Sequence, residues 1–548
     1  MALKWLIKRS GKLIPSLIVV SILNGIYAFT SVAFALLCRG IIDSAVNGDR
    51  RQLMWYGAGM FGAIAAALTI RIVSNSLSER IRVRLEIVCR DHMILTLSHK
   101  KYVATSRFHS GELMNRLFHD VQIITDGVTT ILPSFVLMLT KGIGAIAVLF
   151  VLSPVFTGLF LVGGLLIIGV TAIFRTKMKT LHKRVQQKAG VVRSYIQEVL
   201  ESLLVVKIFA AENRVQSKAA ELQEEYYKEQ MRRRRISIWA GAGMGFAFEM
   251  AYLVALLLGA SQIMAGTMTY GTLTAILQLV GQVQQPFANL SGLLPKYYSM
   301  IASTERLMEL ESLENEGAVR QQNPSELYGK MERICVENLA FSYGENPVLR
   351  DTSFSVEKGD FVSISGLSGG GKTTLFLLLM GVYEAGAGSL ELAFADGSRQ
   401  NLDEGTRSLF AWVPQGKYIF SGTLWDNIAF LQEDVTEERM MRAVRLACVD
   451  DFLDTLPDGL QTMVGERGFG LSEGQVQRVA IARALLSDAP ILMLDEATSA
   501  LDDQTELRVL ENISSLSEKT CFVVTHRKAA IGFCNRHLVV DDGRVGEE

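Results

Sequence analysis

Long hydrophobic stretches dominate the chain up to Gly292, and short alternating runs follow them. Six of these stretches approach the ~20 consecutive apolar residues that a helix needs to cross a bilayer. They are residues 14–38, 54–76, 131–152, 154–175, 237–264 and 270–292. The pattern predicts an all-α transmembrane domain with six spans.

Two connections between these stretches are long, charged and helical in pattern, at residues 77–130 and 176–236. Their excess of lysine and arginine places them on the cytosolic side, which also makes the N-terminus and the region after the sixth span cytosolic. Each connection has room for two helices of about 35–40 Å. The reversals expected near residues 106–111 and 201–212 are candidates for contact with the C-terminal domain.

Two local features have competing interpretations. The run Arg232 to Arg235 resembles a nucleic-acid-binding patch, but directly before a span it more naturally marks the lipid headgroup boundary. The charged start and apolar run at the N-terminus resemble a signal peptide. The apolar run from Ile14 to Cys38 exceeds the usual 7–15-residue signal core, so we expect a retained first span.

The pattern of residue types along the chain changes after the sixth predicted span. A polar helix is expected over 296–313, and the stretch 314–330, which contains Gln321-Gln-Asn-Pro-Ser325, is typical of a linker. Beyond it, short β-rich runs alternate with helical patterns, which indicates an α/β domain. The predicted organisation is a transmembrane domain at 1–313, a linker at 314–330 and an α/β domain at 331–548.

Composition supports a membrane protein. Hydrophobic residues make up 49% of the 548 residues, and charged residues make up 20%, below the usual share of about 25%. The net charge of −1 argues against a nucleic-acid partner held by bulk charge. The six cysteines have neither C-x-x-C nor zinc-site spacing, so we interpret them as reduced packing residues.

A glycine-rich loop supplies the first candidate site. The strand Phe361–Ser365 leads into GLSGGGKT and then into apolar helix formers, which fits the P-loop pattern G-x-x-x-x-G-K-[ST]. Backbone N–H groups of such a loop cradle phosphate oxygens. Lys372 would reach the β and γ phosphates, and Thr373 would hold Mg²⁺. The predicted nucleotide-binding residues here are Gly366, Leu367, Ser368, Gly369, Gly370, Gly371, Lys372, Thr373 and Thr374.

Two further motifs follow. The apolar strand Ile491–Leu494 ends in Asp495 and Glu496, which are placed to reach the Mg²⁺ shell and to polarise an attacking water. Ser472 has the character of an N-cap, and a capped helix N-terminus binds phosphate. Taken alone, each motif has an ordinary structural explanation. Asp495 and Glu496 could be an acidic pair that caps a helix, and Ser472 could begin an ordinary capped helix.

Together these motifs resemble the ATP-binding cassette (ABC) ATPase domain. The resemblance implies a P-loop NTPase fold that binds ATP and Mg²⁺, and it assigns further roles by motif. It implies catalytic roles for Glu496, His526 (the switch in Val524-Thr-His) and Gln415 (the Q-loop), with Gln415 also a metal ligand beside Thr373 and Asp495. It implies nucleotide contacts for Tyr343, which stacks on adenine, for Ser472, Gly474 and Gln475 of the signature motif, and for Asp502 of the D-loop.

The N-terminal half resembles the six-span, exporter-type (type IV) half-transporter of the same family. Gly111–Arg116 with Asp120 resembles its first intracellular loop, and Val464–Arg467 resembles the segment that senses the coupling loops. Glu473 departs from the pattern, because glycine is commoner at the third signature position. The chain also ends at Glu548, soon after His526, without the family's usual terminal helix.

The resemblance implies that each ATP site is built from two chains, so a second half-transporter is required as a homodimer or heterodimer partner. Hydrolysis by in-line water attack would drive alternating access in the cell membrane, with the N-terminus and the ATPase domain cytosolic. Export of an unidentified substrate is expected. An importer on the same scaffold, an ATP-gated channel or non-transporting sensor, and a soluble ATPase adaptor are the alternatives, and no nucleic acid is expected as a partner.

Two charges lie inside predicted spans, Lys141 in the third and Glu249 in the fifth. Such groups are costly in lipid and usually face a cavity or a partner. We expect a Lys141–Glu249 ion pair within or across subunits, with substrate contact as the alternative. Gln278, Gln282 and Gln285 recur at near-helical spacing and would line the same cavity or join helices.

Overall fold

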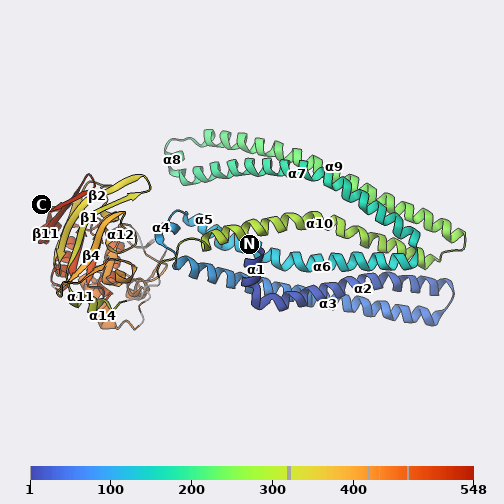
Figure 1. Cartoon of the computed structure of the whole chain (residues 1–548), viewed down its shortest axis with the longest axis horizontal. Helices are drawn as coiled ribbons and strands as arrows, with labels where there is room; N and C mark the ends of the chain where they lie inside the picture. Colours follow the sequence, from blue (N-terminus) through green and yellow to red (C-terminus); the bar gives the residue numbers. More distant parts are fainter. Residues whose placement is uncertain are drawn as a thin grey trace. The chain divides into compact units, whose positions relative to one another are not determined.

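The computed structural model describes residues 2–317, 322–416, 419–430, 432, 434–465, 468, 470–516 and 518–547. For residues 3, 161, 165–177, 179, 286–291 and 529 it describes the backbone alone. The chain divides into two compact units. Unit 1 comprises Met1–Leu95 and Ser110–Glu311, and unit 2 comprises Thr96–His109 and Ser312–Glu548 (Figure 1).

Unit 1 is entirely helical. Its elements are α1 (Ala2–Ser10), the 3₁₀ turn η1 (Gly11–Leu13), α2 (Ile14–Val46), α3 (Arg50–Ser98, whose last turn belongs to unit 2), α5 (Ser110–Asn115), the π-helix η2 (Arg116–Asp120), α6 (Val121–Leu152), α7 (Pro154–Glu201), α8 (Leu203–Ile208), α9 (Glu212–Met264) and α10 (Tyr270–Glu311). Among the residues that the structure describes in full, four helical stretches are long and apolar enough to span a membrane, Lys4–Val46, Arg50–Ser98, Ser110–Leu152 and Glu212–Met264. The predicted spans 154–175 and 270–292 lie in α7 and α10 and include residues that the structure does not describe in full.

Tight reversals join the helices where the sequence supplies the right residues. Ser153 is extended, and Pro154 occupies the first turn of α7, where its missing N–H costs nothing. Gly48 and Gly266 adopt positive φ values of 73° and 70° after α2 and α9, a backbone conformation that glycine reaches without strain. These short connections allow consecutive helices to run antiparallel.

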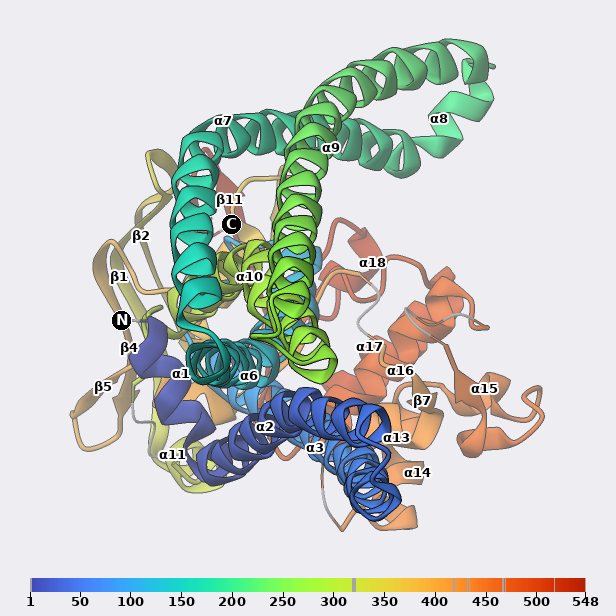
Figure 2. The ribbon, with the colours of Figure 1, turned by 90° about the vertical axis from the view of Figure 1, so that its right-hand side faces the viewer.

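Helices α2, α6 and α10 pack against one another, and α7 packs against α9. Figure 2 shows α7 and α9 side by side, bending away from the α2, α6 and α10 group. A buried apolar cluster joins these helices, and it includes Val32, Ala145, Phe156, Ala255 and Leu279. Close approach depends on small residues: a Cβ on Gly259 of α9 would lie 2.3 Å from Leu273 Cδ1 of α10.

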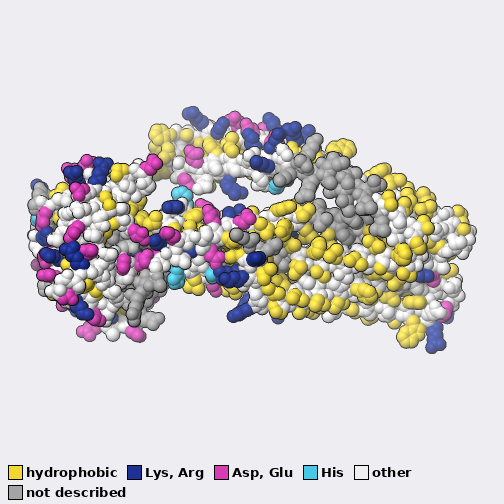
Figure 3. Space-filling model, in the orientation of Figure 1, with side chains coloured by type: hydrophobic (Ala, Val, Ile, Leu, Met, Phe, Trp, Pro, Cys, Tyr) yellow, Lys and Arg dark blue, Asp and Glu magenta, His cyan; other side chains and the backbone are white. Residues whose placement is uncertain are grey.

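The surface of unit 1 is divided by polarity. Hydrophobic side chains cover the part of unit 1 that carries the α2–α3, α6–α7 and α9–α10 connections, whereas lysine, arginine and carboxylate side chains gather on the α7–α8–α9 end (Figure 3). Helix α1 is fixed to the far end of α10, because Trp5 and Arg9 both donate hydrogen bonds to Glu311.

A buried ion pair joins the π-helix η2 to α10. Asp120 is fully buried and accepts hydrogen bonds from Arg306 Nε at 2.7 Å and Ser303 Oγ at 2.9 Å. On the other side of the same turn, Arg116 is buried and bonds to Glu112 at 2.6 Å and Glu309 at 2.8 Å. The wider turn of the π-helix therefore places two charged side chains against α10.

Unit 2 is built on two sheets. The antiparallel sheet has the order β2 (Asn346–Glu357), β1 (Met331–Tyr343), β4 (Ala387–Phe394) and β5 (Arg399–Asn401). The six-stranded sheet has the order β12 (Arg544–Glu547), β11 (Arg536–Asp541), β3 (Phe361–Gly366), β10 (Thr520–Val524), β9 (Ile491–Asp495) and β6 (Phe410–Val413), and its pairs are parallel except β11–β12. A small antiparallel pair, β7 (Gly422–Thr423) and β8 (Met463–Val464), completes the strands of the described chain.

The helices of unit 2 are short. They are α4 (Tyr102–Thr105), α11 (Pro324–Lys330), α12 (Lys372–Leu379), α13 (Leu424–Ala429), α14 (Glu437–Leu446), α15 (Asp450–Leu453), α16 (Glu473–Leu486), α17 (Asp503–Ser514) and α18 (Lys528–Ile531), with 3₁₀ turns η3 (Glu404–Leu409) and η4 (Gly459–Gln461). The all-α membrane region followed by an α/β domain confirms the predicted fold class.

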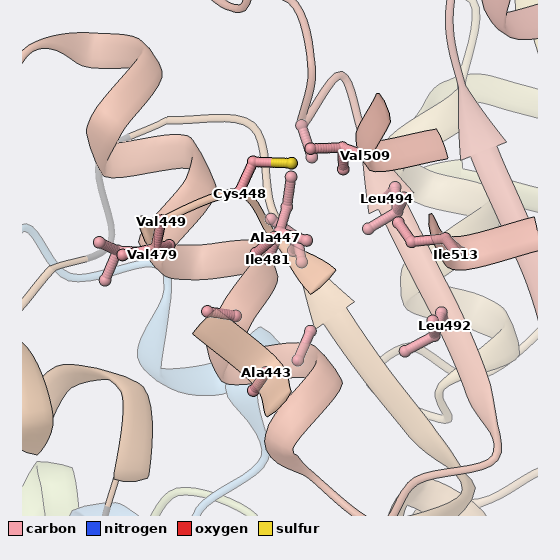
Figure 4. Close-up of a cluster of buried hydrophobic side chains, with 14 of the residues drawn as sticks. Ala443, Ala447, Cys448, Val449, Val479, Ile481, Leu492, Leu494, Val509 and Ile513 are labelled. Carbon is pink, nitrogen blue, oxygen red and sulfur yellow. The ribbon is translucent and has the colours of Figure 1, made fainter. Parts of the chain in front are cut away.

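Two hydrophobic clusters hold the six-stranded sheet. Strand β9 is buried along its whole length, as expected for a central parallel strand. Figure 4 shows one cluster, in which side chains of α14, α16 and α17 surround Leu492 and Leu494. Cys448 packs in this cluster, and burial raises the pKa of the Cys534 thiol to about 11. These are packing cysteines, as expected.

Two segments depart from the predicted domain organisation. Part of the expected linker forms α11, because Asn323 caps its first turn by accepting from Ser325 N and Glu326 N, and Leu327 packs into the core. The segment Thr96–His109, expected in the transmembrane domain, belongs to unit 2. It forms a β-bridge from Lys100 to Asn315, so an internal loop of the membrane region is part of the α/β unit.

We predict that Arg306→Met destabilises unit 1, because Asp120 stays buried without its cation. Breaking a buried pair costs about 3–5 kcal/mol. We expect no more than about 3 kcal/mol here because Arg306 is partly exposed to water. Thermal unfolding in detergent measures the loss. The matched variant Arg82→Met removes ion pairs with Glu79 and Asp126, whose carboxylates are solvent-exposed, and should change the midpoint little. Equal losses in the two variants would contradict the buried-pair argument.

Candidate active site

The candidate phosphate loop lies between β3 and α12. Gly366 ends β3 with φ of 136°, and a Cβ there would lie 2.2 Å from the carbonyl oxygen of Val540. Gly371 has φ of 103° and forms the N-cap of α12. The glycines are required by backbone geometry, and the loop ends at the N-terminus of a helix, where N–H groups are free to bind an anion.

Lys372 and Thr373 begin α12 and point toward the loop and toward β9. Lys372 is buried, and its Nζ donates to the carbonyl oxygens of Gly366 at 2.8 Å and Leu367 at 2.9 Å. Thr373 Oγ1 donates to Asp495 Oδ2 at 2.7 Å. Residues far apart in the chain therefore meet because β3 and β9 both flank β10.

The two carboxylates after β9 have different environments. Burial raises the pKa of Asp495, and the neighbouring Glu496 carboxylate adds to this shift, although Thr373 and Lys372 oppose it. Glu496 has a left-handed backbone with φ of 49°, and its Oε2 accepts a hydrogen bond from Gln415 Nε2 at 2.6 Å. Such strained conformations concentrate at functional sites. Thr373, Asp495, Glu496 and Gln415 are thus brought together at one edge of the sheet.

Tyr343 lies at the end of β1 beside the loop. Its hydroxyl and Thr374 Oγ1 are 3.2 Å apart, and its ring packs edge-on against Tyr383 at 5.5 Å between centroids. Tyr102 of the segment Thr96–His109 contacts the other side of Tyr383 at 6.4 Å, and Lys101 Nζ donates to Glu384 at 2.8 Å. An aromatic chain therefore runs from the predicted adenine-stacking residue to a loop of the membrane region.

The predicted signature residues form a separate group. Ser472 and Gln475 make a capping box at the start of α16, with Ser472 N to Gln475 Oε1 at 2.8 Å. A Cβ on Gly474 would lie 2.8 Å from the carbonyl oxygen of Ala500, and Asp502 caps α17 through Thr505 N at 3.0 Å. Among the described residues, no hydrogen bond or ion pair joins Ser472, Gly474 or Gln475 to the phosphate loop.

Three other predicted features are exposed or are described only in part. His526 follows β10 and is exposed, and Glu473 is exposed in the first turn of α16, where a negative charge is favourable. Of the segment Val464–Arg467, Val464 pairs with Gly422 in β8, whereas Glu466 and Arg467 lie outside the described residues.

Residues that the motif analysis did not single out hold the predicted catalytic region together. Arg527 donates to the carbonyl oxygens of Leu501 at 3.0 Å and Ser499 at 3.1 Å, and to the buried Glu506 at 2.7 Å. Gln477 of α16 accepts from Ala500 N at 2.9 Å. The position of Arg527 directly after His526 is the one sequence signal that marks this network.

We predict that Gly366→Ala abolishes binding of a fluorescent ATP analogue, because its Cβ would meet the Val540 carbonyl and β3 would have to move. Gly397→Ala is the matched control: Gly397 has φ of 82° but nothing within 4 Å of the added Cβ. Both variants have a backbone penalty, because both glycines have positive φ values that alanine rarely adopts, and only the first has the clash. Unchanged analogue affinity in Gly366→Ala would contradict this geometry.

Comparisons with known proteins identify the family of the chain. The family model "ABC transporter transmembrane region" matches residues 17–287, and the model "ABC transporter" matches residues 349–499. An ATP-dependent lipid A-core flippase of Syntrophus aciditrophicus (strain SB) is 30% identical over 449 residues, which is 81% of this chain and 74% of that protein. A fatty acid ABC transporter ATP-binding/permease protein of Mycobacterium bovis is 29% identical over 442 residues, 80% of this chain and 69% of that protein.

A solved structure has the same fold. The structure of a bacterial Atm1-family ABC exporter with ATP bound superposes with a TM-score of 0.80 at 22% identity, and the match covers 97% of this chain and 94% of that one. The chain therefore belongs to the ABC transporter family, joins the family's transmembrane region and ATPase domain in one polypeptide, and couples ATP hydrolysis to transport across a membrane.

Proposed function

We propose that the chain is one half of a dimeric exporter that moves an amphipathic substrate out of the cell by alternating access. The observation that carries the proposal is the pair of contacts Thr373–Asp495 and Gln415–Glu496. They place a hydroxyl, an amide and two carboxylates beside a phosphate loop, which is the set that phosphoryl transfer to water requires.

Each of the candidate site residues has a proposed role. Lys372 and the loop N–H groups hold the β and γ phosphates, and the Tyr343 ring stacks on adenine. Glu496 orients and polarises the attacking water, and His526 lies on the γ-phosphate side of the site. The residues also fit Mg²⁺, since Thr373, Asp495 and Gln415 offer the oxygen ligands that this ion prefers. When bound, the ion would neutralise charge on the phosphates.

The signature residues support a dimer. Ser472 and Gln475 bond to each other, and among the described residues neither side chain bonds to the phosphate loop of the same chain. In the proposed assembly, a partner chain, identical or not, presents Ser472, Gly474, Gln475 and Asp502 to this loop. Closure of the two ATPase domains would then be transmitted to the membrane helices through the contact of Tyr102 with Tyr383.

The apolar surface of unit 1 supports a position in the cell membrane, with the N-terminus and the ATPase domain cytosolic by the charge of the connections.

The relatives named above are a lipid A-core flippase and a fatty acid transporter, which favours export of a lipid-like substrate. Glu496 and His526 favour turnover over an ATP-gated channel or sensor. Import on the same scaffold would be revealed by the direction of transport in vesicles.

We predict that Glu496→Gln binds ATP with near wild-type affinity but loses at least about 100-fold in ATPase rate, because the amide cannot polarise water. The isosteric control Glu511→Gln lies on the exposed face of α17 and should retain full activity. Phosphate release from purified protein in proteoliposomes measures the rate. Near wild-type turnover in Glu496→Gln would overturn the assignment.

We predict that two inactive chains complement each other if the working unit is a homodimer. Lys372→Ala removes the phosphate cation, and Ser472→Arg blocks the signature helix, so each variant alone should have no ATPase activity. A mixed dimer contains one site without either change, and activity should return on mixing before reconstitution. Failure to recover any activity, with dimers confirmed by crosslinking, would exclude sites shared between identical chains.

A further inference from the structure

The predicted intramembrane ion pair does not form within the chain. Lys141 of α6 donates from Nζ to Gln285 Oε1 of α10 at 2.6 Å, and Glu249 of α9 is exposed and makes no ion pair with the described residues. The within-chain version of the Lys141–Glu249 prediction is therefore wrong. An amide oxygen satisfies one donor of the ammonium group and does not neutralise its charge.

The depth of these groups makes the uncompensated charge costly. Lys141 lies well inside α6, which ends at Leu152, while Gln285 and Glu249 lie well inside α10 and α9, whose connected ends are Tyr270 and Met264. At the rise of an α-helix, the distances to these ends are about 17, 23 and 23 Å, inside a hydrocarbon layer of about 30 Å. Charged groups at such depths are costly in lipid and usually face a cavity or a partner.

The three helices are also joined at this depth. Gln284, next to Gln285 on α10, donates to the carbonyl oxygen of Phe248 on α9 at 3.3 Å. Nearby on α10, Gln282 donates to the carbonyl oxygen of Ser31 on α2 at 2.7 Å, while its own Oε1 is buried without a partner among the described residues. The lysine therefore sits in a belt of polar side chains that fixes α2, α6, α9 and α10 relative to one another.

The hydrocarbon layer limits which ligand can reach Lys141. Exposed apolar side chains of α6, namely Phe135, Leu139 and Ile143, cover other faces of the same helix. A ligand that neutralises the lysine here must bring a negative charge on a hydrophobic body.

We propose that Lys141, held by Gln285, binds the anionic headgroup of an amphiphilic substrate, such as a carboxylate or phosphate on an alkyl chain. This inference rests on the proposed transport function and names its substrate class. The paired charges bury together, which offsets the cost of each in lipid, and Gln285 keeps the ammonium group directed at the helix interface.

Equilibrium binding without nucleotide tests the site independently of ATP turnover. The full chain is placed in nanodiscs of phosphatidylcholine, and displaceable binding of tritiated dodecyl phosphate is measured. Dodecyl maltoside, dodecyltrimethylammonium and inorganic phosphate serve as competitors. We expect only unlabelled dodecyl phosphate to displace the probe. Equal displacement by dodecyl maltoside would overturn the charge requirement, and displacement by inorganic phosphate would overturn the need for an alkyl chain.

Variants localise the binding. Lys141→Met should raise the half-displacing concentration of dodecyl phosphate about tenfold or more, since a charged hydrogen bond contributes ~1.5–3 kcal/mol. Lys141→Arg should keep it within about threefold, and Glu249→Gln should not weaken binding. Unchanged binding in Lys141→Met, with a thermal unfolding midpoint like that of the wild type, would overturn the proposal.

Two further arms separate the remaining possibilities. If a bilayer lipid supplies the anion, nanodiscs that contain phosphatidylglycerol should suppress probe binding, which supports the same headgroup chemistry. If Lys141 instead pairs with Glu249 of a second copy, Lys141→Glu should lower the unfolding midpoint and Glu249→Lys should restore it in the double variant. That rescue would overturn the proposal. A failed Glu496→Gln test would remove the transport function and leave these binding results unaffected.

Discussion

The parallel register of three strands determines everything that the ATPase domain can do. Val524 of β10 pairs with Ile364 of β3 and with Asp495 of β9, so all three strands end at the same edge. The phosphate loop leaves one strand there, the two carboxylates leave another, and His526 follows the third. A shift of one residue in either pairing would turn Asp495 away from Thr373, because side chains alternate between the two faces of a strand.

Burial then gives the two carboxylates different properties. Asp495 is enclosed beside Thr373 and Lys372, whereas Glu496 is turned outward by its left-handed backbone toward Gln415. The strain at Glu496 is stabilised by a hydrogen bond from its own N–H to the carbonyl of Val524 at 3.2 Å. Adjacent residues of one chain thereby acquire a buried position beside the loop and an outward position beside Gln415, a difference that the dipeptide Asp-Glu does not by itself specify.

Local patterns were sufficient to predict the fold class and the position of Asp495 and Glu496 beside the loop, whereas Gln415 was predicted only through the family resemblance. Glycine, proline and apolar spacing act on neighbours in the chain, and the motifs record those local requirements. Long-range contacts were not predictable in the same way. Nothing near Glu506 in the sequence marks it as a buried partner of Arg527, and nothing near Lys141 selects Gln285 over Glu249. The helix α11 was missed because Asn and Pro are typical of linkers and equally of helix starts.

The inclusion of Thr96–His109 in the α/β unit has a consequence for producing that unit alone. The chain passes between the two units three times, after Leu95, after His109 and after Glu311. The inner segment is also joined to the linker by the bridge from Lys100 to Asn315. A version cut at the linker would therefore lack a segment of its own unit, including Tyr102, whose ring packs against Tyr383.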